Sequence, residues 1–140
     1  MSDREREEGT QLQLDFSKLR KIASSQQEVI PVVVQDADSM EVLIVAYVNQ
    51  IALETAMREK KATFWSTSRN ELWIKGKTSG DLLQLVEIRV NCEQNSLVYR
   101  VRRVGEGACH TVDSQGRKRG SCYYRRIRPD GSLEFLEEGK

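Results

Sequence analysis

The sequence contains no long apolar run, a single histidine and only three cysteines. A helix that spans a membrane needs about 20 consecutive, mostly apolar residues, and no stretch of the 140 residues approaches that length. The N-terminus also lacks the apolar core of a secretion signal. We therefore expect a protein that is not inserted in a membrane and that resides in the cytoplasm.

The number and spacing of the cysteines exclude several kinds of site. Three is an odd number, so disulfide bonds within the chain cannot use every thiol. Thiols stay reduced in the cytoplasm, where clustered cysteines more often bind a metal or react than form crosslinks. No two cysteines have the Cys-x-x-Cys spacing of a zinc finger or zinc ribbon. The phosphate-binding loop Gly-x-x-x-x-Gly-Lys-Ser/Thr is absent as well.

The net charge is only +1, which argues against a general nucleic-acid-binding protein. The charges are nevertheless unevenly distributed. Residues 100–128 contain nine arginines or lysines and two acidic residues, a local charge of about +7. Such a segment attracts phosphate groups, although the same side chains also suit the solvated face of a strand.

A chain of 140 residues has the usual length of one domain. Residues 1–11 are highly charged and predict a disordered tail, so residues 12–140 are expected to form the single domain. Residues 42–48 are continuously apolar, which indicates a strand buried on both faces. The expected strands are residues 29–36, 42–48, 63–66, 72–75, 82–90, 96–104, 122–127 and 133–136.

Helices are expected at two places. A short one begins near Ser17, and a clear one follows Asn49, which is a favourable N-cap residue. The apolar face of the second helix consists of Ile51, Leu53, Ala56 and Met57. The predicted fold class is therefore α+β, mainly β with one clear helix, arranged as a twisted sheet or pseudo-barrel.

All three cysteines lie in one part of the sequence, beside expected turns or strand ends. Zinc binds thiolates and imidazoles in four-coordinate sites, and a catalytic zinc keeps one position for water. Cys92, Cys109 and Cys122 with one open position fit that arrangement. The alternative is that they pack as small buried apolar side chains.

The only histidine, His110, follows Cys109 directly. Histidine titrates near neutral pH, which suits proton transfer beside a metal-bound water. As a fourth ligand it would instead close the zinc site and make it structural. A third possibility is that His110 is an ordinary surface residue.

Two polar loops offer hydroxyl groups and cations that suit phosphate groups. Their residues include Thr67, Ser68, Arg69, Lys75, Lys77, Thr78 and Ser79. The alternative is an ordinary polar hairpin. Trp65 and Trp73 flank the first loop, and each is a candidate either for the core or for stacking on a base.

Five short motifs occur in the order in which phosphoribosyl-AMP cyclohydrolases of histidine biosynthesis carry them. They are Ala46-Tyr47-Val48-Asn49, residues 64–69 (Phe-Trp-Ser-Thr-Ser-Arg), residues 72–80 (Leu-Trp-Ile-Lys-Gly-Lys-Thr-Ser-Gly), Cys109-His110-Thr111 and residues 121–125 (Ser-Cys-Tyr-Tyr-Arg). The chain therefore resembles this family from about residue 29 to residue 126.

The resemblance implies hydrolysis of the N1–C6 bond in the purine ring of N1-phosphoribosyl-AMP. It also implies a zinc ion on Cys92, Cys109 and Cys122, with ligands shared between the subunits of a homodimer, and His110 as the acid–base group. The residues expected to contact the phosphorylated nucleotide are Trp65, Ser66, Thr67, Ser68, Arg69, Lys75, Thr78 and Ser79.

The sequence departs from the family at two places. The family binds a second metal, usually taken as magnesium, through Asp-Cys-Asp-x-Asp, but Asn91, Glu93 and Asn95 stand at the three acidic positions here. The segment between Cys109 and Cys122 is also longer than usual. Two other functions therefore stay open: hydrolysis of another phosphorylated purine-like ring, and a non-catalytic zinc-stabilised module that binds a nucleotide or RNA.

Overall fold

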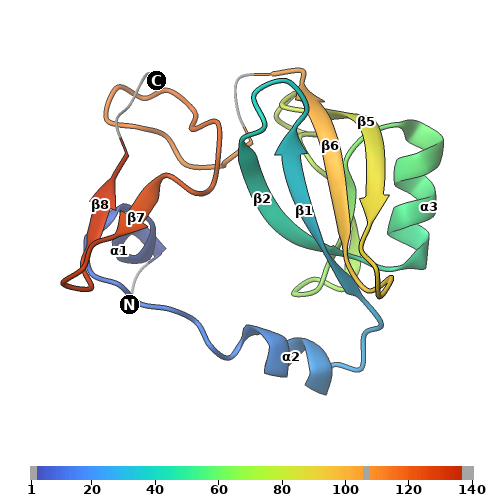
Figure 1. Ribbon diagram of the computed structural model, residues 1–140, viewed down its shortest axis with the longest axis horizontal. Coiled ribbons are helices and arrows are strands. Elements are labelled where there is room, and N and C mark those ends of the chain that lie inside the picture. The colour runs from blue at the N-terminus through green and yellow to red at the C-terminus, as the bar shows by residue number, and fades with distance from the viewer. Residues whose placement is uncertain (1–2, 106–107, 137–140) are drawn as a thin grey trace.

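A mixed four-stranded sheet forms the centre of the computed structural model, which describes residues 3–105 and 108–136 (Figure 1). Its strands are β1 (Ile30–Asp36), β2 (Val42–Val48), β5 (Leu83–Val90) and β6 (Leu97–Arg103), in the spatial order β2-β1-β6-β5. β1 and β2, both expected strands, form an antiparallel hairpin, and β5 pairs with β6 in the same way. β1 and β6 are parallel, so both end at the same edge of the sheet.

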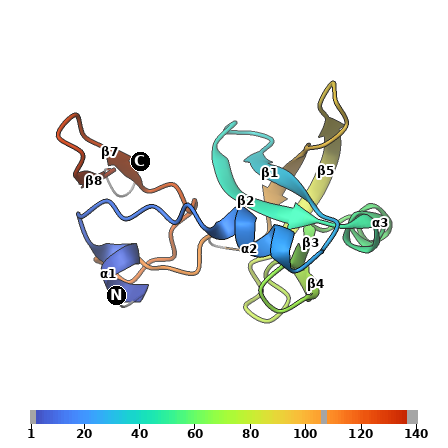
Figure 2. The ribbon, with the colours of Figure 1, turned by 90° about the horizontal axis from the view of Figure 1, so that it is seen from below.

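Two hairpins and three helices surround this sheet. The hairpins are β3 (Thr63–Ser66) with β4 (Glu71–Ile74) and β7 (Arg125–Ile127) with β8 (Leu133–Phe135), and the helices are α1 (Asp3–Glu8), α2 (Lys18–Ser24) and α3 (Gln50–Glu59). Figures 1 and 2 show α1 beside β7 and β8 at one side of the molecule, and the central sheet with α3 at the other. No helix in the described part of the chain combines the length and the apolar character that crossing a bilayer requires.

The hydrophobic core lies between the sheet and the layer made by α3 and β3. Side chains alternate along β1, and Val32 and Val34 are fully buried on its core face. Tyr99 of β6 is buried beside Phe64 of β3, with 5.7 Å between the ring centroids. The Tyr99 hydroxyl donates to the backbone carbonyl of Thr63 at 3.1 Å, so its polar end is satisfied inside the core.

The predicted N-cap of α3 is confirmed, because the Asn49 side chain accepts a hydrogen bond from Ala52 N–H at 2.9 Å. The predicted apolar face is wrong in part: Ile51 and Met57 are exposed. The helix packs through its small residues, Ala52 and Ala56, which lie one turn apart and allow a close approach to β3.

Three further expectations differ from the structure. β2 is not buried on both faces, because it is an edge strand and Val42 and Val45 are exposed. Within residues 3–105 and 108–136 the sheet is open rather than a pseudo-barrel, since no hydrogen bonds join β2 to β5. The segment expected to be a disordered tail contains α1, and its first two residues lie outside the described part.

Candidate active site

Cys109 and Cys122 lie together at the edge of the sheet where β1 and β6 end. Backbone hydrogen bonds fold the intervening segment back on itself, since Cys109 N–H donates to the Arg119 carbonyl at 3.1 Å. Cys122 N–H donates to the carbonyl of Leu43, near the start of β2, at 2.8 Å. Cys109 is buried and Cys122 is exposed, so the pair can be reached from one side.

Hydrogen bonding gives the two sulfur atoms different proton affinities. A hydrogen bond from the Cys122 thiol lowers the pKa of Cys109 to about 5, and the same interaction raises the pKa of Cys122. The Thr111 hydroxyl lies 3.0 Å from Cys109 Sγ and also favours the thiolate. The thiolate is the form of cysteine that reacts or binds a metal, so both effects favour the reactive form of Cys109.

Cys92 follows β5 in the turn that leads to β6. Figure 1 shows that this turn lies at the opposite end of the sheet from the ends of β1 and β6. The chain between Cys92 and Cys109 includes the seven residues of β6, which span about 20 Å at 3.3 Å per residue. Within the described residues no group of three or more His, Cys, Asp or Glu side chains is placed to hold a metal ion. One chain therefore brings together two of the three predicted zinc ligands.

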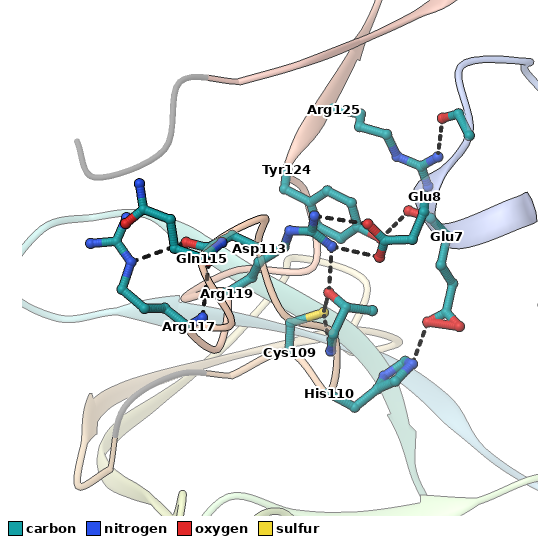
Figure 3. Close-up of polar contacts among 12 residues, drawn as sticks. Glu7, Glu8, Cys109, His110, Asp113, Gln115, Arg117, Arg119, Tyr124 and Arg125 are labelled. Carbon is teal, nitrogen blue, oxygen red and sulfur yellow. Dashed lines mark hydrogen bonds and ion pairs between the residues drawn. The ribbon is translucent and has the colours of Figure 1, made fainter. Parts of the chain in front are cut away.

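His110 is exposed, and its Nε2 contacts the carboxylate of Glu7 from α1 (Figure 3). The next residue of α1, Glu8, accepts two hydrogen bonds from Arg119 at 2.8 and 3.0 Å. The Tyr124 hydroxyl donates to the Glu7 carbonyl at 2.6 Å. The N-terminal segment thus docks onto the part of the chain that carries Cys109 and Cys122.

The sequence did not identify Glu7 as a candidate site residue. Its neighbours in the sequence are acidic and basic residues in alternation, a pattern typical of a solvated tail. Its contact with His110 joins positions that are 103 residues apart. No local pattern marks such a pair. The only available sign is the charge balance, since an acidic segment near one terminus complements the basic segment at residues 100–128.

A second cluster of predicted site residues lines a groove of about 290 Å³ at the turn between β3 and β4. The residues that line this groove are Lys18, Val45, Ala46, Tyr47, Trp65, Ser66, Thr67, Ser68, Arg69 and Trp73. Five of the predicted substrate-binding residues, those at positions 65–69, are thereby brought together. Trp65 is half-buried, and its indole N–H donates to Gln27 Oε1 at 3.1 Å.

Lys75, another predicted substrate-binding residue, lies beside this groove but does not line it. Its Nζ lies 5.9 Å from the ring centroid of Trp73, which lines the groove. Its charge also favours the Cys122 thiolate, against the larger effect of Cys109 that raises the pKa of Cys122. Thr78 and Ser79 are exposed in the following loop and do not line the groove.

The turn at the expected second-metal site is closed by its own amide groups. Asn91 Oδ1 accepts from the backbone N–H groups of Asn95 and Ser96 at 2.9 and 3.0 Å. Asn91 Nδ2 donates to Asn95 Oδ1 at 2.7 Å, so that oxygen is engaged as well. Glu93 is the one carboxylate, and its Oε2 accepts from Asn95 Nδ2 at 3.4 Å. Magnesium prefers anionic oxygen ligands, so these residues do not fit it.

Comparison with known proteins identifies the family. A sequence profile described as phosphoribosyl-AMP cyclohydrolase matches residues 44–124. The phosphoribosyl-AMP cyclohydrolase of Sphingopyxis alaskensis is 47% identical over 109 residues, covering 78% of this chain and 81% of that protein. The phosphoribosyl-AMP cyclohydrolase of Chlorobium phaeovibrioides is 36% identical over 124 residues, covering 89% of this chain and 85% of that protein. The chain therefore belongs to the phosphoribosyl-AMP cyclohydrolase family.

Proposed function

We propose that this protein is a zinc-dependent phosphoribosyl-AMP cyclohydrolase that hydrolyses the N1–C6 bond of the purine ring of 1-(5-phosphoribosyl)-AMP in histidine biosynthesis. The observation that carries the proposal is the pairing of Cys109 with Cys122 in a chain whose positions 65–69 line a groove. A thiol pair suits a metal, and the groove offers hydroxyl groups, cations and aromatic rings that suit a phosphorylated base.

The residues that would hold the zinc are Cys109 and Cys122 of one chain and Cys92 of a second copy. The donor set fits zinc, because thiolates are among its preferred ligands and Cys109 already has a lowered pKa. When bound, zinc supplies a water that loses its proton near neutral pH. His110 follows Cys109 directly and is exposed, so it would be available to accept or donate a proton, and its contact with Glu7 would orient the ring.

The test of this function is turnover of 1-(5-phosphoribosyl)-AMP by the purified, zinc-loaded protein, followed by ultraviolet absorbance. We expect the substrate spectrum to be replaced by that of the ring-opened product. Failure of fully zinc-loaded protein to consume the substrate would contradict the proposal. It would favour a divergent enzyme that acts on another phosphorylated purine-like ring, for which the altered residues 91–95 and the long segment before Cys122 are the supporting observations.

We predict that the protein is a homodimer that weakens when zinc is removed. Cys92 and Cys109 lie beyond opposite ends of strand β6, which is about 20 Å long, so a three-cysteine site needs two copies. Light scattering at micromolar concentration should give the mass of a dimer, and a chelator should shift it towards the monomer. A monomer that retains a full complement of zinc would overturn this prediction.

We predict that the protein binds magnesium weakly, with a dissociation constant on the order of millimolar or worse. Two of the three carboxylates of the family motif are amides here. Each lost negative charge weakens the binding free energy of the ion by roughly a few kcal/mol. Activity is measured against magnesium concentration at constant zinc. The unaltered protein should respond feebly, and Asn91→Asp combined with Asn95→Asp should increase magnesium affinity. Saturable activation of the unaltered protein at micromolar magnesium would contradict this interpretation.

A further inference from the structure

Helix α2 lies against the groove at the turn between β3 and β4, although no part of α2 falls within the family match at residues 44–124. Its first residue, Lys18, is one of the residues that line the groove. The sequence did not identify this lysine as a site residue, because nothing local distinguishes it from other surface lysines.

Side-chain contacts hold α2 and the chain that follows it on this turn. Lys18 Nζ donates to Thr67 Oγ1 at 3.3 Å. At the other end of the segment, Gln27 Nε2 donates to the Thr67 carbonyl at 2.9 Å, and Gln27 Oε1 accepts from Trp65 Nε1 at 3.1 Å. The position of Lys18 is therefore determined by contacts on both sides of α2, rather than by one flexible side chain.

The groove presents hydrogen-bond donors and positive charge at this end. Lys18 and Arg69 both line it, together with the hydroxyl groups of Ser66, Thr67 and Ser68. The described lining contains no carboxylate, although Arg69 also reaches Glu71 outside it at 3.5 Å. A phosphate group accepts hydrogen bonds from hydroxyl, ammonium and guanidinium groups alike, and such charge-assisted bonds are the strong ones.

The remaining lining suits a nucleoside. Tyr47, Trp65 and Trp73 present aromatic rings, and stacking of a base on such a ring is sequence-tolerant and favourable. The donors at one end of the groove therefore suit a phosphate group, and its aromatic rings suit the base of the same nucleotide.

We propose that Lys18 of α2 and Arg69 of the β3–β4 turn together bind one phosphate monoester group of the nucleotide substrate. The proposal rests on the proposed function, since it assigns a residue to the substrate of that activity. It adds a phosphate contact from a segment outside the family match and makes α2 part of the substrate site.

The experiment measures binding of AMP and of adenosine to the zinc-loaded, full-length protein by titration calorimetry. The variants are Lys18→Gln and, as a matched control, Lys21→Gln, which removes the same charge from the same helix at an exposed residue that does not line the groove. Loss of one charge-assisted hydrogen bond should weaken AMP binding by Lys18→Gln about tenfold to a hundredfold. Adenosine should bind both variants as it binds the unaltered protein, and Lys18→Arg should restore most of the AMP affinity.

Three results would overturn the proposal. One is equal weakening of AMP binding by Lys18→Gln and Lys21→Gln, which would indicate a general charge effect. Another is that Lys18→Gln weakens adenosine binding as much as it weakens AMP binding, which would show that the phosphate group is not what Lys18 contacts. The third is that the unaltered protein does not bind AMP even at millimolar AMP. Because these measurements do not require turnover, they separate this proposal from the proposed function. An inactive protein with Lys18-dependent AMP binding would contradict the function alone.

Discussion

Replacing Cys92, Cys109 or Cys122 with serine is expected to remove the zinc and abolish activity, with a loss of about a thousandfold or more in turnover. Cys109 and Cys122 lie together in one chain, and the lowered pKa of Cys109 already favours its thiolate. Serine offers no comparable ligand, because its hydroxyl stays protonated near neutral pH. The measurements are metal content by mass spectrometry and the initial rate with 1-(5-phosphoribosyl)-AMP. Full zinc content in all three variants would show that the ligands are assigned wrongly.

Mixed dimers test whether two copies share the ligands. Combining Cys92→Ser with Cys109→Ser chains leaves one intact ligand set in each mixed dimer, so about one quarter of the unaltered activity should return in a symmetric dimer at equal proportions. The control mixture combines Cys109→Ser with Cys122→Ser. Both substitutions then damage the same half of the site, and no activity should return. Equal recovery in both mixtures, or in neither, would contradict shared ligands.

Replacing His110 with alanine is expected to leave the zinc content unchanged and to lower the rate about a hundredfold or more, as for loss of a general acid–base group. The structure favours this role over a fourth ligand, because His110 is exposed and directed towards Glu7 (Figure 3). Zinc content and rate are measured on the same preparation. Loss of zinc would identify His110 as a ligand, and an unaffected variant would exclude both roles.

Glu7→Gln is the companion variant for this test. If Glu7 orients the imidazole through the contact with Nε2, the substitution should lower kcat by less than His110→Ala does and leave zinc content and KM nearly unchanged. The double variant should be no slower than His110→Ala, because the orienting group has nothing left to orient. Additive losses in the double variant would show that Glu7 acts independently of His110.

Much of the local structure could be predicted from the sequence. The Asn49 cap, the β1–β2 hairpin and the turn between β3 and β4 each depend on residues close together in the chain, so their side chains and periodicity indicate them directly. The substrate-binding residues at positions 65–69 fall in one such turn, which brings them into one groove without any long-range pairing. The family motifs carried the same local information.

The burial of individual elements was predicted less well. β2 is as apolar as a central strand, yet it lies at an edge because β1 pairs with β6 on its other side. That parallel pairing joins strands separated in the chain by β2, α3, the β3–β4 hairpin and β5, and no feature of either strand specifies its neighbour. An open sheet and a pseudo-barrel differ only in which strands pair, so the sequence did not distinguish them either.

The residue types of the candidate site were determined by the sequence, but their grouping was decided by the tertiary structure. The spacing of the three cysteines in the sequence does not show which of them lie together. In the structure, β6 runs from the end of the sheet near Cys92 to the opposite end, where Cys109 and Cys122 lie. A helix as short as α1 is marginal by itself, and contacts with Arg119 and His110, more than 100 residues away, hold it in place. Such contacts depend on how the chain folds back on itself, which no local sequence pattern records.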